Sequence, residues 1–180
     1  APGMRYLTTT GGEPLPDGVD RNQVVVERSI PIEKALDDCF LAWEMNGDPI
    51  PRSHGCALRL IVPGYFACNQ IKFVKRLAFT TAQASAKIQQ TGYRMRPIGE
   101  TGAPEQPAMW EMPVKSFITR PTERTPVVAG KVRVTGVAFG GAKAVRKAEV
   151  STDGKRWHEA RWVGPDLGRY AWRVFEVELE

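Results

Sequence analysis

Glycine and proline interrupt this chain so often that they leave little room for a long helix. The 180 residues include 17 Gly and 14 Pro, and many short runs of Val, Ile and Leu lie between them. Proline removes a backbone donor and glycine destabilises a helix interior, so this pattern favours strands joined by turns over a helical bundle. We therefore predict an α+β or all-β fold.

The charge distribution argues against a nucleic-acid partner. The formal net charge is +5, but Lys and Arg are scattered among 20 acidic residues instead of forming one block. A nucleic-acid binder would need a basic stripe with interleaved aromatic residues. We expect only a modest attraction for anions, and a nucleic-acid function ranks last.

The cysteines and the apolar runs argue against a disulfide framework, a zinc site and a membrane span. Cys39, Cys56 and Cys68 are odd in number and have no C-x-x-C spacing, so they indicate neither a disulfide framework nor a zinc site. We expect them to be small buried residues. No apolar run reaches the roughly 20 residues that cross a bilayer, and no signal peptide is recognisable, so we expect no membrane partner.

The first half of the chain predicts short, mixed elements. We expect a loop at residues 8–20 because Gly, Pro, Thr and Asp cluster there. Ser29 should cap a short helix that ends near Asp38. Asn46-Gly47 is a strong tight-turn signal because both residues tolerate positive φ. Further expected elements are strands at 24–26, 40–45 (buried), 58–62 and 73–79, and a helical turn or loop at 82–90.

The second half changes to alternating strands after a proline-rich connector. Residues 96–113 contain four prolines, and we place a domain boundary near Met112, giving domains 1–111 and 112–180. Asp153-Gly154 is a predicted hairpin turn. The predicted strands lie at 131–135, 145–151, 157–163 and 169–179. This pattern indicates a β-sandwich of the immunoglobulin type, but such domains need about 100 residues, so we expect strands to be missing.

The densest polar cluster surrounds the predicted strand 58–62. It contains His54, Arg59, Asn69, Gln70 and Lys72. A planar guanidinium and a mobile ammonium at strand ends can converge on one anion, so a phosphate-bearing ligand would suit this cluster. The alternative is that these are solvated charges on a sheet face, and spacing alone favours that alternative.

A long motif resembles the sulfite oxidase family. Residues 43–64 read WEMNGDPIPRSHGCALRLIVPG, similar to the family pattern E-M-N-G-x-P-L-P-x-x-H-G-x-P-x-R-x-x-V-P-G, and Ile71-Lys72 resembles its following V-K. Residues 91–94 (TGYR) resemble the segment that bears the family's active-site tyrosine. Residues 112–121, 136–141 and 150–157 resemble the family's dimerisation domain. The resemblance thus runs from about Val24 onwards.

The resemblance implies a molybdenum cofactor, Mo-molybdopterin, and a set of residues that bind it. The residues implied to bind the pyranopterin and its phosphate are His54, Arg59, Gln70, Ile71 and Lys72. Tyr93 is the implied catalytic residue, beside the oxygen groups of the metal. On this basis the second domain is an incomplete immunoglobulin-like dimerisation domain, after the C-terminal part of a molybdopterin-binding domain.

The sequence also departs from the family pattern. The family holds molybdenum through one cysteine thiolate in a C-x-G-N-R-like context N-terminal to the matched motifs, and none of the three cysteines here has that context. Cys56 and Ala57 stand where phenylalanine and proline are usual. We therefore expect no metal ligand in this chain, and we expect it to be a fragment or one piece of a split enzyme.

The implied activity is oxidation of a small sulfur oxyanion, sulfite to sulfate, by oxo transfer. The implied partners are the oxyanion, a c-type cytochrome or other haem acceptor, and either a second copy or a chain that supplies the missing N-terminal cofactor half. Sulfane dehydrogenases and nitrate reductases are related alternatives, and a non-catalytic dimerisation module is the rival of another class. A periplasmic location is the expectation from bacterial relatives.

Overall fold

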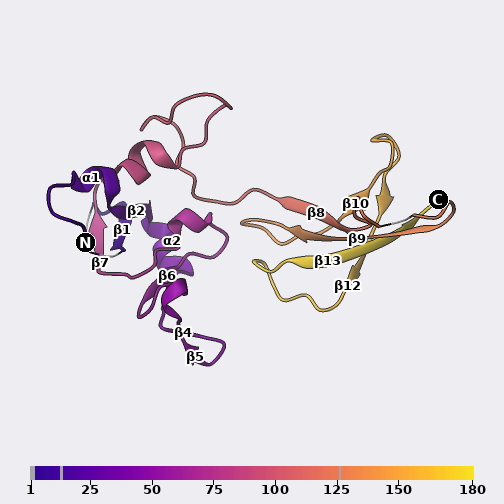
Figure 1. Cartoon of the computed structure of the whole chain (residues 1–180), viewed down its shortest axis with the longest axis horizontal. Helices are drawn as coiled ribbons and strands as arrows, with labels where there is room; N and C mark the ends of the chain where they lie inside the picture. Colours follow the sequence, from indigo (N-terminus) through magenta and orange to yellow (C-terminus); the bar gives the residue numbers. More distant parts are fainter. Residues whose placement is uncertain (1–2, 13, 126) are drawn as a thin grey trace. The chain divides into compact units, whose positions relative to one another are not determined.

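The chain divides into two compact units. In this computed structural model, residues 3–12, 14–125 and 127–180 are described, and the units are Ala1–Trp110 and Glu111–Glu180 (Figure 1). Both consist mostly of small β-sheets with few helices, which agrees with the predicted mixture of elements. No helix among the described residues is long and apolar enough to cross a membrane.

A three-stranded antiparallel sheet organises the N-terminal unit. Its order is β2-β1-β7, with β1 at Tyr6–Gly11, β2 at Val26–Pro31 and β7 at Arg76–Thr80. The predicted loop at 8–20 is therefore wrong at its start, because Thr8, Thr9 and Thr10 are buried in the central strand. β-Branched threonine fits a pleated sheet, and the Thr8 hydroxyl lies 2.7 Å from Oγ of Ser29 and 2.8 Å from Oγ1 of Thr80.

Short elements complete this unit and surround its core. The core contains Ile30, Leu60, Val62, Tyr65 and Ile71. The elements are α1 (Arg21–Val24), α2 (Ile32–Asp37), β3 (Phe40–Ala42) paired with β6 (Arg59–Ile61), β4 (Glu44–Met45) paired with β5 (Asp48–Pro49), the 3-10 helices η1 (Arg52–His54) and η2 (Ala67–Asn69), and the π-helix η3 (Ile88–Gly92).

Local predictions here are confirmed where turn chemistry decides the conformation. Asn46 and Gly47 have φ of 58° and 89° between β4 and β5, as the predicted tight turn requires. The helix near Ile32 exists, but Ser29 does not cap it: Ser29 is fully buried in β2, and Pro31 is the N-cap. The predicted buried strand at 40–45 is split into β3 and β4 and is largely exposed, with Trp43 64% exposed.

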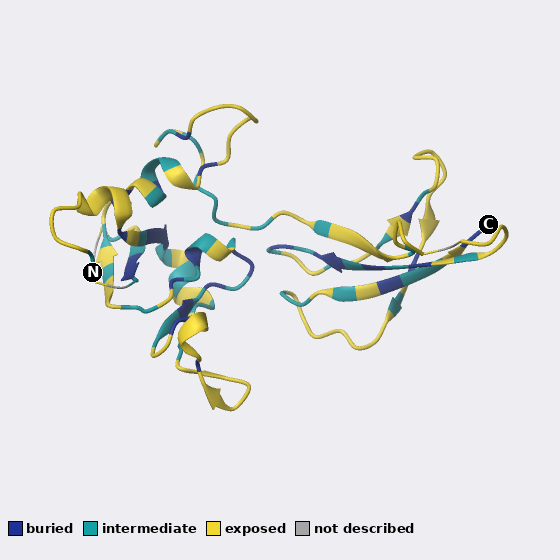
Figure 2. Cartoon of the chain, viewed as in Figure 1, coloured by how far each residue is buried: buried dark blue, intermediate teal, exposed yellow. Residues whose placement is uncertain are grey.

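The C-terminal unit contains a four-stranded and a two-stranded antiparallel sheet. Its core cluster includes Val134, Ala138, Val150, Ala160 and Phe175. Buried positions run along β9 (Val132–Phe139) and β13 (Arg173–Leu179), as Figure 2 shows. The first sheet has the order β12-β13-β9-β8 and the second pairs β10 with β11. The strands are β8 (Lys115–Arg120), β9 (Val132–Phe139), β10 (Glu149–Val150), β11 (His158–Glu159), β12 (Arg161–Val163) and β13 (Arg173–Leu179).

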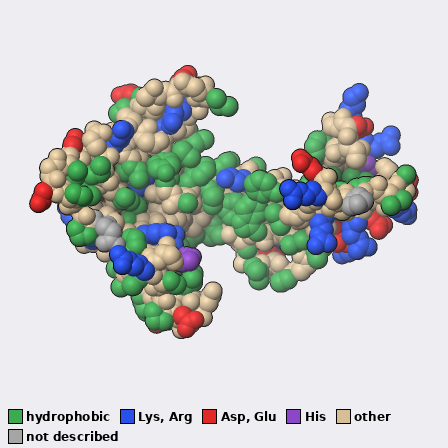
Figure 3. All heavy atoms as spheres, viewed as in Figure 1, with side chains coloured by type: hydrophobic (Ala, Val, Ile, Leu, Met, Phe, Trp, Pro, Cys, Tyr) green, Lys and Arg blue, Asp and Glu red, His purple; other side chains and the backbone are tan. Residues whose placement is uncertain are grey.

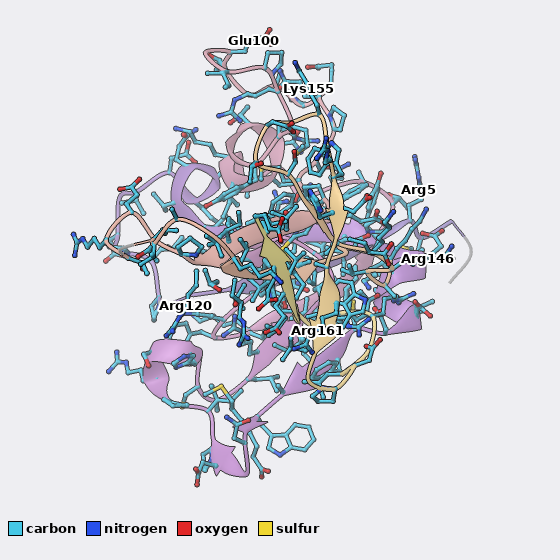
Figure 4. All side chains as sticks on the ribbon, turned by 90° about the vertical axis from the view of Figure 1, so that its right-hand side faces the viewer. Arg5, Glu100, Arg120, Arg146, Lys155 and Arg161 are labelled. Carbon is cyan, nitrogen blue, oxygen red and sulfur yellow. The ribbon has the colours of Figure 1, made fainter. Side chains whose placement is uncertain are left out.

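Charged side chains are spread around the C-terminal unit. Arg161 is ion-paired with Glu176 across β12 and β13, and Nζ of Lys147 lies 2.9 Å from a Glu149 carboxylate oxygen. In the view onto this unit, the labelled cations lie apart from one another (Figure 4): Arg120, Arg146, Lys155 and Arg161. Charges distributed in this way are typical of a solvated surface.

Replacement of Gly136 by alanine tests the packing of this unit. A Cβ atom there would lie 2.2 Å from Cζ of Phe175 and 2.6 Å from the carbonyl oxygen of Phe117. We expect Gly136→Ala to lower the free energy of unfolding by about 1–3 kcal/mol, because the core has no space for the methyl group. Denaturant unfolding followed by tryptophan fluorescence measures the change. Arg133→Ala, at an exposed position of the same strand, should change stability by less than about 0.5 kcal/mol. Equal losses of stability in the two variants would contradict the close packing at Gly136.

Candidate cofactor site

His54 ends the short helix η1, and the turn after it lies directly against Lys72. Gly55 has φ of +104°, and its N–H donates to the carbonyl of Arg52 at 3.1 Å. A Cβ atom at Gly55 would lie only 2.7 Å from Cβ of Lys72. Glycine is therefore required by conformation and by space. Without a side chain at this position, the turn approaches Lys72 closely.

Two cations donate to consecutive carbonyl groups of this turn. Nη1 of Arg59 lies 3.1 Å from the His54 oxygen, and Nζ of Lys72 lies 2.7 Å from the Ser53 oxygen. The exposed His54 ring has Nδ1 3.1 Å from Oγ of Ser53. Figure 3 shows Lys and Arg side chains beside a His on the surface of this unit. The structure thus brings together three of the predicted residues, His54, Arg59 and Lys72.

The donors of this cluster fit an anionic group. Nε of Arg59 is buried and has no hydrogen-bond acceptor. Within the described part of the chain, neither Arg59 nor Lys72 forms an ion pair with a carboxylate. A phosphate can accept from a guanidinium and from an ammonium group together. The residues present therefore fit the phosphate of the cofactor that the sequence leads us to expect.

Gln70 and Ile71 direct their side chains to the protein itself. The Gln70 amide accepts from N–H of Val62 at 2.8 Å and donates to the Val62 carbonyl at 2.6 Å. Ile71 is 2% exposed and packs in the core, and its carbonyl accepts from N–H of Leu60. These side chains fix the backbone that leads into Lys72. A contact of either residue with a cofactor stays a prediction.

Tyr93 lies directly after the π-helix η3. Its N–H donates to the carbonyl of Ile88 at 3.3 Å, and the side chain is half-exposed. The guanidinium of Arg28 lies 5.7 Å from the centre of its ring. Arg28 also donates to Oδ1 of Asn69, which precedes the segment ending at Lys72. Tyr93 is therefore connected to the cation cluster through Arg28 and Asn69.

Arg28 is a residue of this region that the sequence did not single out. It is 1% exposed in β2, and burial lowers the pKa of its guanidinium; the Cys68 thiol opposes this effect, and the Arg94 cation adds to it. An arginine remains charged even so. The only signal in the sequence was a charged residue inside an apolar stretch, which also suits an ordinary surface strand.

The cysteines differ in their surroundings. Cys39 and Cys68 are partly buried, and burial raises the pKa of both thiols, that of Cys39 to about 11. Such thiols are poor sources of a thiolate ligand. Cys56 is exposed, so its predicted burial is wrong. No group of three or more His, Cys, Asp or Glu residues suited to a metal occurs in the described parts of the chain.

Replacement of Gln70 tests whether its side chain is needed for folding. Gln70→Leu should lower the free energy of unfolding by roughly 1–3 kcal/mol, because the backbone N–H and C=O of Val62 would lose their partners. Thermal unfolding followed by circular dichroism measures this. Gln23→Leu, at an exposed site of α1, is the control and should leave the midpoint nearly unchanged. A Gln70→Leu protein with an unchanged unfolding midpoint would contradict the structural role of the Gln70 side chain.

Two family models match successive parts of the chain. Residues 1–88 match the oxidoreductase molybdopterin binding domain, and residues 106–180 match the Mo-co oxidoreductase dimerisation domain. His54, Arg59, Gln70, Ile71 and Lys72 lie within the first match. Tyr93 lies between the two.

Individual relatives agree with these matches. Mitochondrial sulfite oxidase of Rattus norvegicus is 33% identical over 162 residues, which are 83% of this chain and 30% of the relative. Sulfite oxidase of Gallus gallus is 34% identical over 163 residues, 84% of this chain and 36% of the relative. The crystal structure of the sulfane dehydrogenase SoxCD from Paracoccus pantotrophus matches with a TM-score of 0.77 and 28% identity, over 99% of this chain and 43% of that chain.

The chain thus spans about a third of the length of these two sulfite oxidases. The family models cover most of its residues in the order in which the two domains follow each other. Motif, models and structural likeness agree, and the chain belongs to the sulfite oxidase family of molybdopterin oxidoreductases.

Proposed function

We propose that the natural protein containing this chain is a molybdenum-dependent oxidoreductase that oxidises a small sulfur oxyanion, with sulfite to sulfate as the leading reaction. The observation that carries the proposal is that two cations, Arg59 and Lys72, donate to one turn while Arg59 Nε lacks an acceptor. This pair lies inside the match to the molybdopterin-binding domain. The similarity to proteins named sulfite oxidase supports the substrate.

The residues of this chain would bind and orient the cofactor and the substrate. The bound molybdenum cofactor would supply the oxo-transfer and redox chemistry. Arg59 and Lys72 would hold the phosphate through charge-assisted hydrogen bonds, and His54 would add a ring N–H on the same turn. The half-exposed Tyr93 would donate its hydroxyl proton in a hydrogen bond to the substrate anion.

The C-terminal unit would pair two copies of the protein. Its two sheets with one shared core are consistent with an immunoglobulin-like sandwich, and the dimerisation-domain match supports a homodimer. The SoxCD match supports a partner chain as the alternative. A c-type cytochrome or other haem acceptor and a periplasmic location are further parts of the proposal, and they rest on the family resemblance.

Sulfane dehydrogenase activity is the second candidate, because the SoxCD structure matches 99% of this chain. A non-catalytic dimerisation module is the third candidate, and it is the one that is not an enzyme. Metal analysis and pterin fluorescence of the purified natural protein, followed by assays with sulfite and with protein-bound sulfane sulfur, separate the three. Bound cofactor with sulfite oxidation supports the proposal, sulfane oxidation alone replaces it, and a protein without pterin and molybdenum overturns it.

Loss of the cation pair should release the cofactor. In the natural protein, Arg59→Met or Lys72→Met should reduce pterin affinity roughly tenfold or more, because each removes a charge-assisted hydrogen bond. The pterin-to-protein ratio after dialysis measures the loss. Arg76→Met removes an exposed cation of β7 and is the matched control. Retention of full cofactor by both site variants would show that the phosphate binds elsewhere.

Tyr93→Phe should affect turnover and leave the cofactor bound. We expect kcat/KM for sulfite to fall about 10- to 100-fold, the effect of one hydrogen bond to a charged group. Steady-state kinetics at matched molybdenum content measure the change. Tyr6→Phe, which removes a hydroxyl in β1, should have little effect. Unchanged kinetics in Tyr93→Phe would exclude a substrate contact.

A further inference from the structure

Arg28 is a buried cation without a carboxylate partner in the described chain. It is 1% exposed, and all its hydrogen-bond acceptors are neutral: the carbonyl of Ile88 at 2.8 Å from Nη1, and Oδ1 of Asn69 at 3.0 Å from Nη2 and 3.4 Å from Nε. A buried guanidinium without a counter-charge is costly. Its positive charge therefore acts on its surroundings with little compensation.

A second buried cation adds to the same region. Arg94 is 4% exposed and donates to the carbonyls of Gln90 and Gln106 and to Oε1 of Gln83, which are again neutral groups. The Arg94 charge lies close enough to lower the pKa of Arg28. Two arginines thus place positive charge beneath the surface at η3, and the Glu105 carboxylate offsets part of the charge of Arg94.

Arg28 lies beside the Tyr93 ring and shares a backbone acceptor with Tyr93. Its guanidinium lies 5.7 Å from the centre of the Tyr93 ring, and the Ile88 carbonyl that accepts from Arg28 also accepts from N–H of Tyr93. Tyr93 is 42% exposed, whereas Arg28 is shielded from water. An anion at the exposed edge of Tyr93 would therefore experience the Arg28 charge through a medium of low dielectric constant.

The Arg28 side chain also supports the start of the segment that leads to Lys72. Asn69 is fully buried, accepts from Arg28 and donates through Nδ2 to the carbonyls of Phe66 and Met109 at 3.1 and 2.9 Å. Removal of Arg28 would leave Oδ1 of Asn69 without its donor. Arg28 is thus the shared support of the Tyr93 segment and of the segment from Asn69 to Lys72.

We infer that Arg28 is a positioning residue for Tyr93 whose uncompensated charge makes this surface prefer a doubly charged oxyanion over a singly charged one. The inference rests on the proposed function and goes beyond it by naming the residue that sets the charge preference. Because Coulomb energy scales with ligand charge, a loss of about fivefold in affinity for a monoanion corresponds to about 25-fold for a dianion.

The test compares sulfate and nitrate as inhibitors of the natural holoprotein at constant ionic strength. Arg28→Met should lower the preference for sulfate over nitrate about fivefold, and Arg28→Lys, which keeps the charge, should restore most of it. Gln89→Met is the matched control: Gln89 lies in η3 and accepts from N–H of Ser29, so this variant removes another buried contact between η3 and β2 without a change of charge. A purely structural role would weaken both anions equally in Arg28→Met, which would overturn the inference.

Hydrogen exchange gives a second readout. It uses the unaltered protein, so it depends neither on turnover nor on whether a variant folds. Sulfate should slow exchange of the Tyr93 amide more than nitrate at equal ionic strength, and equal slowing or none would contradict the inference. A protein that shows this preference but holds no pterin would refute the proposed function and leave the charge preference standing. A loaded, active protein without the preference would refute only the role of Arg28.

Discussion

The free edge of β2 is the constraint on which the N-terminal unit depends. β2 is the outer strand of its sheet, so the backbone of Ser29 has no neighbouring strand on one side. Side chains supply the partners: Gln89 accepts from the Ser29 N–H at 3.1 Å, and the Trp110 indole donates to its carbonyl at 2.9 Å. These bonds occupy the backbone groups of Ser29 that another strand could otherwise pair with, and they attach η3 and Trp110, the last residue of the unit, to the sheet.

This covered edge also determines where the two parts of the candidate site lie. Tyr93 follows η3 directly, and Arg28, the residue of β2 before Ser29, joins η3 to Asn69. From Asn69 the chain continues into Lys72, which lies against the turn at Gly55. The buried polar contacts of Arg28 thus join the segment that bears Tyr93 to the segment that leads to Lys72. Buried networks of this kind are rigid when every member has a partner.

The sequence was informative where local chemistry decides the structure. Asn46-Gly47 predicted its turn. The motif at 43–64 led to Arg59, and Ile71-Lys72 after it led to Lys72; both cations donate to one turn in the structure. It was less informative where tertiary contacts override local preference. Ser29 resembled a helix cap but lies at the sheet edge. The Thr-rich start of the predicted loop is a central strand, in which the Thr8 hydroxyl bonds to Ser29 and Thr80 on the two neighbouring strands. Arg28 could not be found from spacing, because only the fold shows that its charge is buried.

The proposed function depends most on Arg59 and Lys72 holding the phosphate of the molybdenum cofactor. The most direct test is an experimental structure of the cofactor-loaded natural protein. We predict that the pterin phosphate lies within hydrogen-bond distance of Nε of Arg59, which lacks an acceptor, and of Nζ of Lys72. A phosphate bound away from the turn at 52–55, with both cations still donating only to Ser53 and His54, would contradict it.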